Sequence, residues 1–233
     1  MFGIEIAPFV IFFIAALFAA LTQGWLRAAI MLVAPILGAI NLWLTPEGNY
    51  WALSLLDFEL SLLRVDRLAV LFGYFIAIVY SLHVKDRMQQ TASMLYAGSA
   101  LGAVFAGDLL TLFVFWELLA LTSVFLIWAR RTDQSYHAGM RYLLFQVISG
   151  LLLLGGIIAY AYQYGSIAFE DIGLSGLHGW LIFLAFGIKC GFPFLHNWLT
   201  DGYPEATPTG TVFLSAFTTK VAIYALARGY PGT

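Results

Sequence analysis

Three charged residues lie near the middle of long apolar segments of this 233-residue chain: Glu117, Lys189 and Lys220. A charge held at mid-bilayer costs about 2.5 to 3.5 kcal/mol even on a lenient insertion scale. Such side chains are therefore expected to face one another or a watery cavity, not lipid. An acid and two amines in a dry interior are residue types that suit a proton relay, because each can bind or release a proton as its surroundings change.

A structural ion pair that joins helices is the alternative explanation for a Glu–Lys couple. Three charged centres fit that explanation less well, since one lysine is left over after Glu117 has paired with the other. The extra lysine needs a second acceptor or must be neutral part of the time. The pattern therefore favours a relay through Glu117, Lys189 and Lys220, and a static pair is the competing hypothesis.

Glycine and proline surround Lys189 in the run Gly187-Ile-Lys-Cys-Gly-Phe-Pro193. Pro193 has no N–H group, and in a helix the bond that it cannot make would have reached the carbonyl of Lys189. With Gly187 and Gly191 on either side, the segment is predicted to be a broken helix. A membrane tolerates such a break only where protein covers it or where it lines a watery cavity.

A polar loop follows this break and contains His196. Imidazole titrates near pH 6.5, so His196 is a candidate for passing protons between loop water and the buried lysines; an ordinary hydrogen bond is the alternative. No histidine has the spacing from another His, Cys or carboxylate that a metal site requires. Cys190 is the only cysteine, which excludes an internal disulfide and a cysteine-bound iron–sulfur cluster. We therefore predict no metal ion and no cofactor in this chain.

The elements that position these residues are predicted to be membrane-spanning helices. Hydrophobic residues make up 61% of the chain and charged residues only 10%, which excludes an ordinary soluble domain. A net charge of −2 offers no basic surface for nucleic acid. We predict an all-α integral membrane protein with about eight transmembrane helices, each long enough to cross roughly 30 Å of hydrocarbon. The apolar stretches are 4–22, 28–44, 68–83, 91–107, 109–129, 138–162, 177–194 and 209–228.

Lysine and arginine divide unequally between the two ends of these stretches. One end carries Arg27, Lys85, Arg87, Arg130, Arg131 and Arg141, and the other carries Arg64, Arg67 and Arg228. Because basic loops tend to stay in the cytoplasm, both termini are predicted to face away from it, in a multi-pass protein of the inner cell membrane. Residues 51–65 roughly alternate between apolar and polar side chains, which predicts a short hairpin in water.

Short motifs at five places in the chain occur together in a known membrane family. They are Phe115-Trp116-Glu117, Lys189 before Gly-Phe-Pro, His196 with Trp198-Leu199, Ala206-Thr-Pro208-Thr and Thr219-Lys220-Val-Ala-Ile-Tyr224. In this combination the chain resembles the proton-translocating antiporter-like subunits, from about residue 61 to residue 228. That family unites the D-type subunit of multisubunit Mrp sodium/proton antiporters with membrane-arm subunits of respiratory complex I.

The resemblance implies that Glu117 pairs with Lys189 of the broken helix and that Lys220 passes protons toward the middle of the membrane. It also implies three leading helices within residues 1–90 and one five-helix repeat over residues 91–228. Family members commonly carry a second, inverted repeat, which is absent from this sequence. We therefore expect either another polypeptide that supplies it or a truncated gene product, with other hydrophobic subunits and lipid as partners.

Three functions are compatible with these observations. The first is a membrane subunit of a monovalent cation/proton antiporter that provides a proton half-channel; a Na⁺ site is less well supported, because Glu117 is the only carboxylate at mid-span. The second is the proton-pumping membrane arm of an NADH:quinone oxidoreductase or a membrane-bound hydrogenase. Without a dinucleotide fingerprint, the chain would leave electron transfer to another subunit. The third is a truncated, non-transporting assembly subunit with static charge pairs.

Overall fold

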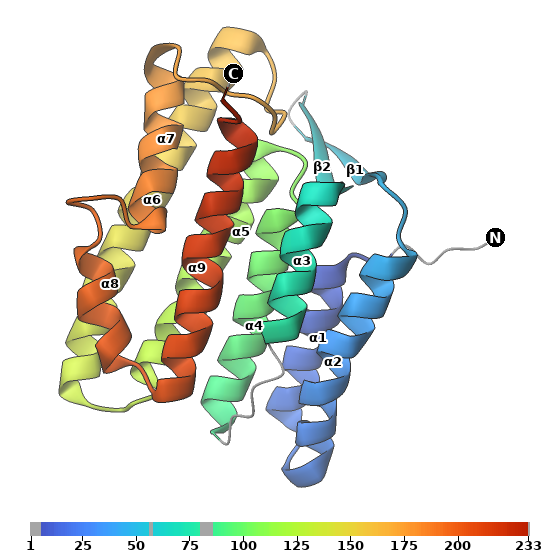
Figure 1. Ribbon diagram of the computed structural model, residues 1–233, viewed down its shortest axis with the longest axis vertical. Coiled ribbons are helices and arrows are strands. Elements are labelled where there is room, and N and C mark those ends of the chain that lie inside the picture. Colours follow the sequence, from blue (N-terminus) through green and yellow to red (C-terminus); the bar gives the residue numbers. More distant parts are fainter. Residues whose placement is uncertain (1–5, 56–57, 80–85, 233) are drawn as a thin grey trace.

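Helices form most of the protein. The computed structural model describes residues 6–55, 58–79 and 86–232, with the side chains of 75–79 left out. Within this part, four helices are long and apolar enough to cross a membrane: α2 (Gly24–Leu44), α5 (Leu109–Trp128), α6 (Asp133–Tyr164) and α9 (Pro208–Gly229). Around them lie α1 (Pro8–Leu21), α3 (Arg67–Val79), α4 (Arg87–Val104) and α7 (Gly176–Cys190) (Figure 1).

The prediction of a helical membrane protein is confirmed at this level. Each predicted apolar stretch contains a helix, although residues 4–5, residues 80–83 and Lys85 lie outside the described part of the chain. Helix α6 begins earlier than predicted because Thr132 and Ser135 form a capping box at its start. Helix α7 ends at Cys190 instead of residue 194 because Gly191 adopts a left-handed conformation. A short helix that was not predicted, α8 (Asn197–Gly202), and a 3₁₀ turn, η1 (Tyr203–Glu205), follow it.

Polar side chains mark where three of the apolar helices begin. Asp86, Asp108 and Thr207 each accept a hydrogen bond from a backbone N–H group in the first turn of α4, α5 and α9. A cap of this kind stabilises a helix by about 1 kcal/mol. The caps fix where these helices begin, and therefore the depth at which Glu117 and Lys220 lie in the bundle.

Helices α4 and α9 lie at the centre of the bundle. Helix α9 packs against α3, α4, α5 and α7, and α4 packs against α1, α3 and α5. Glycines on α4 make the close approach possible: a Cβ atom at Gly98 would lie 2.9 Å from the ring of Phe13, and one at Gly102 would lie 2.2 Å from the ring of Phe115. Small residues at such positions allow helices to pack closely in a membrane.

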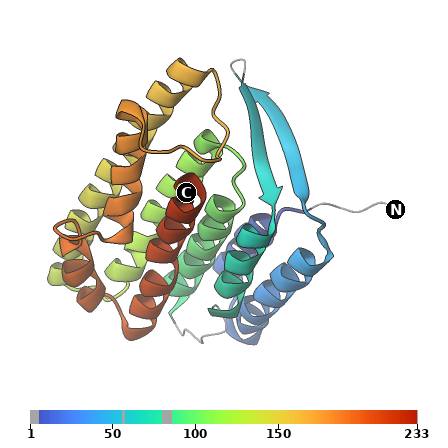
Figure 2. The ribbon, with the colours of Figure 1, turned by 45° about the horizontal axis from the view of Figure 1, so that its top comes forward.

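The predicted hairpin is present at one end of the bundle. Its strands β1 (Gly48–Leu55) and β2 (Phe58–Val65) pair antiparallel, with Gly48 opposite Val65. Figure 2 shows it rising beside the end of the helices. The backbone N–H group of Ser61 donates to Oδ2 of Asp108 at 2.9 Å, so the cap of α5 also anchors β2. We call this the hairpin end, and the opposite end, where α5 passes into α6, the α5–α6 end.

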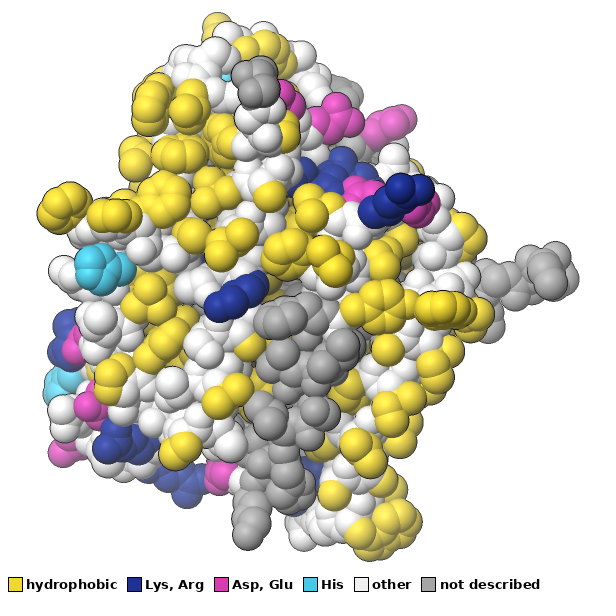
Figure 3. Space-filling view, in the orientation of Figure 1, with side chains coloured by type: hydrophobic (Ala, Val, Ile, Leu, Met, Phe, Trp, Pro, Cys, Tyr) yellow, Lys and Arg dark blue, Asp and Glu magenta, His cyan; other side chains and the backbone are white. Residues whose placement is uncertain are grey.

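Arginine–carboxylate pairs gather at the two ends, and the surface between them is largely hydrophobic (Figure 3). Large apolar side chains such as Leu17, Leu32 and Leu151 are more than half exposed on that surface, as contact with lipid requires. The pairs include Arg130–Glu205, Arg131–Asp86 and Arg141–Asp201 at the α5–α6 end, and Arg64–Asp66 and Arg228–Asp66 at the hairpin end.

Candidate functional site

Lys189 lies in the last turn of α7, and its side chain is 0% exposed. Its Nζ atom donates a hydrogen bond to the backbone carbonyl of Trp116 in α5 at 2.8 Å and stands 4.3 Å from the centre of the indole ring. A cation over an aromatic face gains about 0.5 to 2 kcal/mol. The amine is thus held by a neutral carbonyl and a ring. None of the carboxylates in the described part of the chain forms an ion pair with it.

The Trp116 ring is fixed by a hydrogen-bonded bridge across three helices. Its Nε1 donates to Oγ of Ser149 in α6 at 3.0 Å, and that hydroxyl donates to the carbonyl of Ala185 in α7 at 2.7 Å. Both Trp116 and Ser149 are fully buried. The bridge therefore determines where Lys189 finds its carbonyl and its ring.

Glu117 follows Trp116 in α5 and is half-buried. Its Oε1 atom is buried without a hydrogen-bond partner in the described part of the chain. It lies against the backbone of Gly150 in α6, where a Cβ atom would stand only 1.7 Å from it. Glu117 and Lys189 attract one another electrostatically. The distance between the amine nitrogen and the nearer carboxylate oxygen nevertheless exceeds the 4.0 Å limit for an ion pair. The carboxylate therefore keeps an oxygen able to accept a proton or a hydrogen bond.

Gln146 lies one helical turn from Gly150 on the same face of α6 and is fully buried. Neither its Oε1 nor its Nε2 has a hydrogen-bond partner among the described residues. Buried amides are almost always bonded to protein or to ordered water. This position is therefore suited to hold an ordered water molecule.

The sequence does not single out Gly150 or Gln146 as residues of the site. The importance of Gly150 depends on which side chain of a neighbouring helix packs against it, and no sequence pattern predicts that contact. Gln146 did carry a signal, because an uncharged amide within the apolar stretch 138–162 is costly for the same reason as a charge.

Helix α7 ends at Cys190, one residue after Lys189, and a loop leads to α8. Gly191 has a φ of 82°, and the N–H groups of Gly191 and Phe192 both donate to the carbonyl of Gly187 at 3.0 Å. This is the arrangement of a glycine C-cap. Pro193 is exposed and follows the break, so the helix has already ended before the proline ring could disrupt it.

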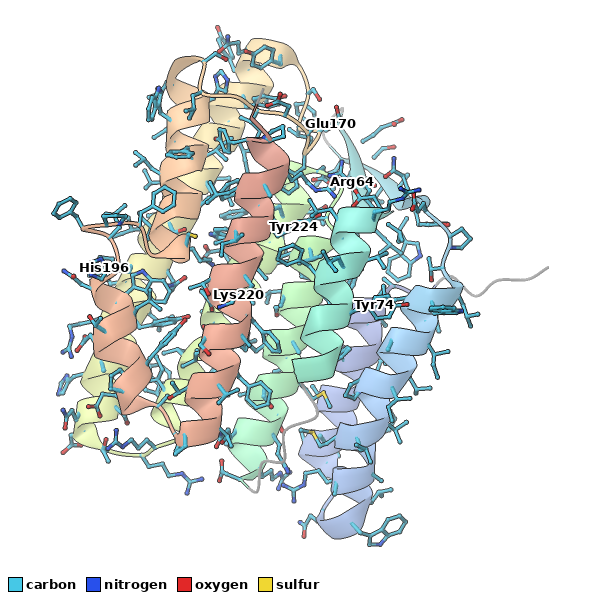
Figure 4. The ribbon with its side chains drawn as sticks, in the orientation of Figure 1. Arg64, Tyr74, Glu170, His196, Lys220 and Tyr224 are labelled. Carbon is cyan, nitrogen blue, oxygen red and sulfur yellow. The ribbon has the colours of Figure 1, made fainter. Side chains whose placement is uncertain are left out.

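His196 lies in the loop between α7 and α8 and is exposed (Figure 4). It occupies the N-cap position of α8, but its side chain makes no capping hydrogen bond. A Cβ atom added to Gly191 would lie 3.7 Å from Cβ of His196, so the two residues are neighbours. The imidazole is thus at the surface beside the break, apart from the buried amine.

Lys220 is half-buried on α9 and bonds within its own helix. Its Nζ donates to the carbonyl of Ser215 at 2.9 Å and to Oγ1 of Thr219 at 3.4 Å. Figure 4 places it on the face of α9 that is toward the viewer, and Figure 3 shows an isolated basic side chain there. The structure therefore brings Glu117 and Lys189 together, whereas Lys220 opens toward the surface.

Arg141 anchors the short helix that follows the break. Its Nε and Nη2 donate to Oδ2 and Oδ1 of Asp201 at 2.5 and 2.8 Å, which ties α8 to α6. These hydrogen bonds lower the pKa of Asp201 from its ordinary value. No cluster of three or more His, Cys, Asp or Glu side chains that could hold a metal ion occurs in the segments 6–55, 58–79 and 86–232.

Comparison with known proteins finds membrane subunits of quinone oxidoreductases and of sodium/proton antiporters. Residues 106–231 match the family model described as NADH:quinone oxidoreductase/Mrp antiporter, TM. An NAD(P)H-quinone oxidoreductase chain 4 of Synechococcus elongatus is 25% identical over 195 residues, covering 80% of this chain and 36% of that protein. A Na⁺/H⁺ antiporter subunit A1 of Staphylococcus aureus is 30% identical over 193 residues, covering 72% of this chain and 24% of that protein.

The fold recurs in the Mrp complex from Dietzia, where the TM-score is 0.80 at 19% identity over 98% of this chain and 49% of the matched chain. The present chain spans about a third or less of the two curated relatives named above. The match to the family model covers more than half of the chain and includes Glu117, Lys189 and Lys220. The chain therefore belongs to the NADH:quinone oxidoreductase/Mrp antiporter transmembrane family.

Proposed function

We propose that this antiporter-like membrane subunit moves protons through a relay whose central step joins Lys189 and Glu117. One observation carries the proposal: among the described residues, the fully buried Lys189 is held by the carbonyl and the ring of Trp116 alone, while the carboxylate of Glu117 follows Trp116 in α5. Lysine is able to lose its proton when it is buried, whereas arginine is not. A cation with neutral partners is therefore free to exchange its proton in a way that a static ion pair is not.

The step requires the two side chains to approach one another. The Nζ atom leaves the Trp116 carbonyl and reaches the carboxylate of Glu117, one residue further along α5. The N–H bond then breaks as an O–H bond forms on the carboxylate, which leaves a neutral amine and a carboxylic acid. The reverse transfer restores both charges. Lys220 would accept the proton on the side toward a neighbouring subunit, and His196 would exchange protons with water beside the break.

The setting that we propose for this relay is a multisubunit monovalent cation/proton antiporter. The similarity to the Staphylococcus aureus subunit A1 supports it. We further propose three leading helices within residues 1–90, a five-helix repeat over 91–228, both termini away from the cytoplasm, and a second polypeptide that supplies the inverted repeat. The proton-pumping arm of a quinone oxidoreductase is the second candidate, and the similarity to the Synechococcus chain 4 supports it.

Transport by the whole complex tests the relay. With the complex that contains this chain reconstituted into vesicles, Lys189→Ala should reduce proton flux driven by a pH gradient by about 100-fold or more, the range typical of losing a proton-transfer group. Arg67→Ala is the control, because that side chain is 93% exposed at the hairpin end. Undiminished flux in an assembled Lys189→Ala complex would exclude the relay and favour a static assembly role.

A second measurement separates the two settings. Proton movement driven by a Na⁺ or K⁺ gradient alone, without an electron donor, supports the antiporter. Proton movement that requires reduction of a quinone supports the redox-driven enzyme.

A further inference from the structure

A groove of about 470 Å³ opens at the surface between α4 and α5, at the α5–α6 end of the bundle. Its floor is apolar and is formed mainly by Met88 and Leu95 of α4 and Phe125 of α5. Its rim is charged and carries Arg87, at the start of α4, and Arg131, just after α5. The groove is therefore amphipathic along its length, with cations at one end and hydrocarbon at the other.

The depth of the groove is close to that of one lipid leaflet. Leu95 lies eight residues beyond Arg87 on α4, which is about 12 Å at the rise of an α-helix. Three residues further, a Cβ atom at Gly98 would lie 2.9 Å from the ring of Phe13, so α1 closes the groove there. Half of the hydrocarbon core of a bilayer is about 15 Å thick. The groove thus fits an acyl chain of one leaflet, whereas a membrane-spanning helix of a partner subunit needs a surface about twice as long.

The rim lies at the level of the membrane surface. Helix α5 is long and apolar enough to cross a membrane, and Arg131 comes three residues after its end at Trp128. The rings of Trp128 and Tyr136 stack with their centres 5.8 Å apart, and Tyr136 is exposed. Exposed aromatic residues of this kind are typical of the interface between membrane and water. The two arginines of the rim are therefore at the depth of lipid headgroups, and the apolar floor lies below them.

The rim has an excess of positive charge. Arg131 is 69% exposed and donates to Oδ1 of Asp86 at 3.1 Å. Arg87 is exposed and donates to the backbone carbonyl of Ala20 at the end of α1. Among the described residues, Arg87 forms no ion pair with a carboxylate. Two guanidinium groups thus share one carboxylate, and both keep N–H donors in the planar arrangement that suits a phosphate group.

We propose that this groove binds an anionic phospholipid, whose phosphate accepts hydrogen bonds from Arg87 and Arg131 while one acyl chain lies over Met88, Leu95 and Phe125. The net positive charge of the rim favours an anionic headgroup over a zwitterionic one. The α5–α6 end is also the end that we propose faces the cytoplasm, where anionic lipids attract basic segments. The lipid site does not depend on the proton relay.

Labelling with a photoreactive lipid tests the site in the intact complex. The complex is reconstituted into phosphatidylcholine vesicles that contain a small fraction of phosphatidylglycerol with a diazirine on one acyl chain. Mass spectrometry then identifies the labelled peptides. Those with residues 88–95 and 121–125 should be labelled about tenfold more strongly than by phosphatidylcholine that carries the same photoreactive chain. The double variant Arg87→Gln and Arg131→Gln should lose about tenfold of the phosphatidylglycerol label, since each arginine near an anionic lipid contributes about fivefold in affinity.

Two single variants separate the groove from a general attraction to basic residues. Arg27→Gln removes a charge at the same end of the bundle, but Arg27 donates to Gln90 at 3.2 Å, on the other face of α4. This variant should keep its label, whereas Arg87→Gln should lose it severalfold. Leu95→Trp fills the apolar floor without changing any charge, and it should lower labelling by phosphatidylglycerol as well.

Three results would overturn the proposal. Equal labelling of the groove by the two lipids would show that the arginines select no headgroup. Equal labelling of the double variant and the unmodified complex would show the same. A groove without lipid label, in which a photoreactive side chain in place of Thr91 crosslinks to another subunit, would assign the groove to a protein partner. Because labelling requires no proton flux, a failure of the relay would leave these outcomes unchanged.

Discussion

Lys189 and Arg228 are both cations with little exposure, on neighbouring helices of the bundle, yet their partners differ. Arg228 is 10% exposed, pairs with Asp66, and lies 5.1 Å from the centre of the Tyr224 ring. Lys189 has an aromatic ring beside it as well, but a carbonyl stands where Arg228 has a carboxylate. Arginine keeps its charge in proteins, whereas a buried lysine can lose it. The same low-polarity surroundings thus support a static pair at the hairpin end and an exchangeable proton at mid-bundle.

The largest expected effect is on stability and belongs to the static cluster. Asp66→Asn leaves Arg64 and Arg228, with side chains 15% and 10% exposed, without their carboxylate. Breaking a largely buried charge pair costs about 3 kcal/mol. We expect a large drop in the thermal midpoint of the purified complex, with transport per folded complex unchanged.

The exposed pair Arg67–Glu47 is the matched control. Nε of Arg67 and Oε1 of Glu47 are 3.4 Å apart, and the two side chains are 93% and 61% exposed. Glu47→Gln should therefore change the free energy of unfolding by less than about 0.5 kcal/mol. Equal destabilisation by Asp66→Asn and Glu47→Gln would show that burial is not what makes the hairpin-end cluster static.

The second expected effect is on transport and belongs to the relay. A Cβ atom at Gly150 would lie 1.7 Å from Oε1 of Glu117, so Gly150→Ala must displace the carboxylate. Misplacing a reacting group by about 1 Å can cost about 100-fold in rate. Alanine favours the helix by about 1 kcal/mol over glycine, so the loss of proton flux should come without loss of stability.

Gly155→Ala provides the comparison on the same helix. Its Cβ would meet only Leu181, at 3.9 Å, so this variant should gain the same helix propensity and keep full proton flux. If the two alanine variants transport equally well, the contact between the Glu117 carboxylate and Gly150 is not needed for transport.

The smallest expected effect concerns Asp201 of α8, which lies outside the membrane-spanning segments and pairs with Arg141 near the α5–α6 end. Its hydrogen bonds lower the pKa of Asp201, so the stabilisation is fully present above the unfolded-state value of about 3.9 and is lost as the pH falls through the lower folded-state value. The side chains are 55% and 39% exposed, so solvent screening keeps the gain small. Thermal unfolding at pH 5 and pH 3 should show a difference that Asp201→Asn slightly reduces; an increase on substitution would contradict the sign.

The sequence could predict the depth of the charged residues but not the direction in which they face. Charge within an apolar stretch is costly wherever it lies, which is why Glu117 and Lys189 could be singled out in advance. Polar and apolar residues are spread around α9 without distinct faces, so its sequence could not show that Lys220 opens toward the surface. That orientation depends on which helices pack against α9, and the packing is a property of the fold.

The end of α7 illustrates a second limit. Both Gly191 and Pro193 are helix-breaking residues, and the sequence predicts a break at the proline because proline lacks the N–H group for a helical hydrogen bond. In the structure the left-handed conformation of Gly191 ends the helix two residues earlier. The approximate place of the break could be predicted from the sequence. Identifying Gly191 as the residue that ends the helix required its backbone dihedral angles.

Proton flux through Glu117→Gln most directly tests the claim that an acid and an amine exchange a proton in the bundle. The amide has nearly the shape of the carboxylate, and Oε1 of Glu117 has no partner in the described residues, so the fold should be retained. We predict that flux driven by a pH gradient falls to the background of empty vesicles while the complex stays assembled. Flux equal to that of the unmodified complex would contradict the account.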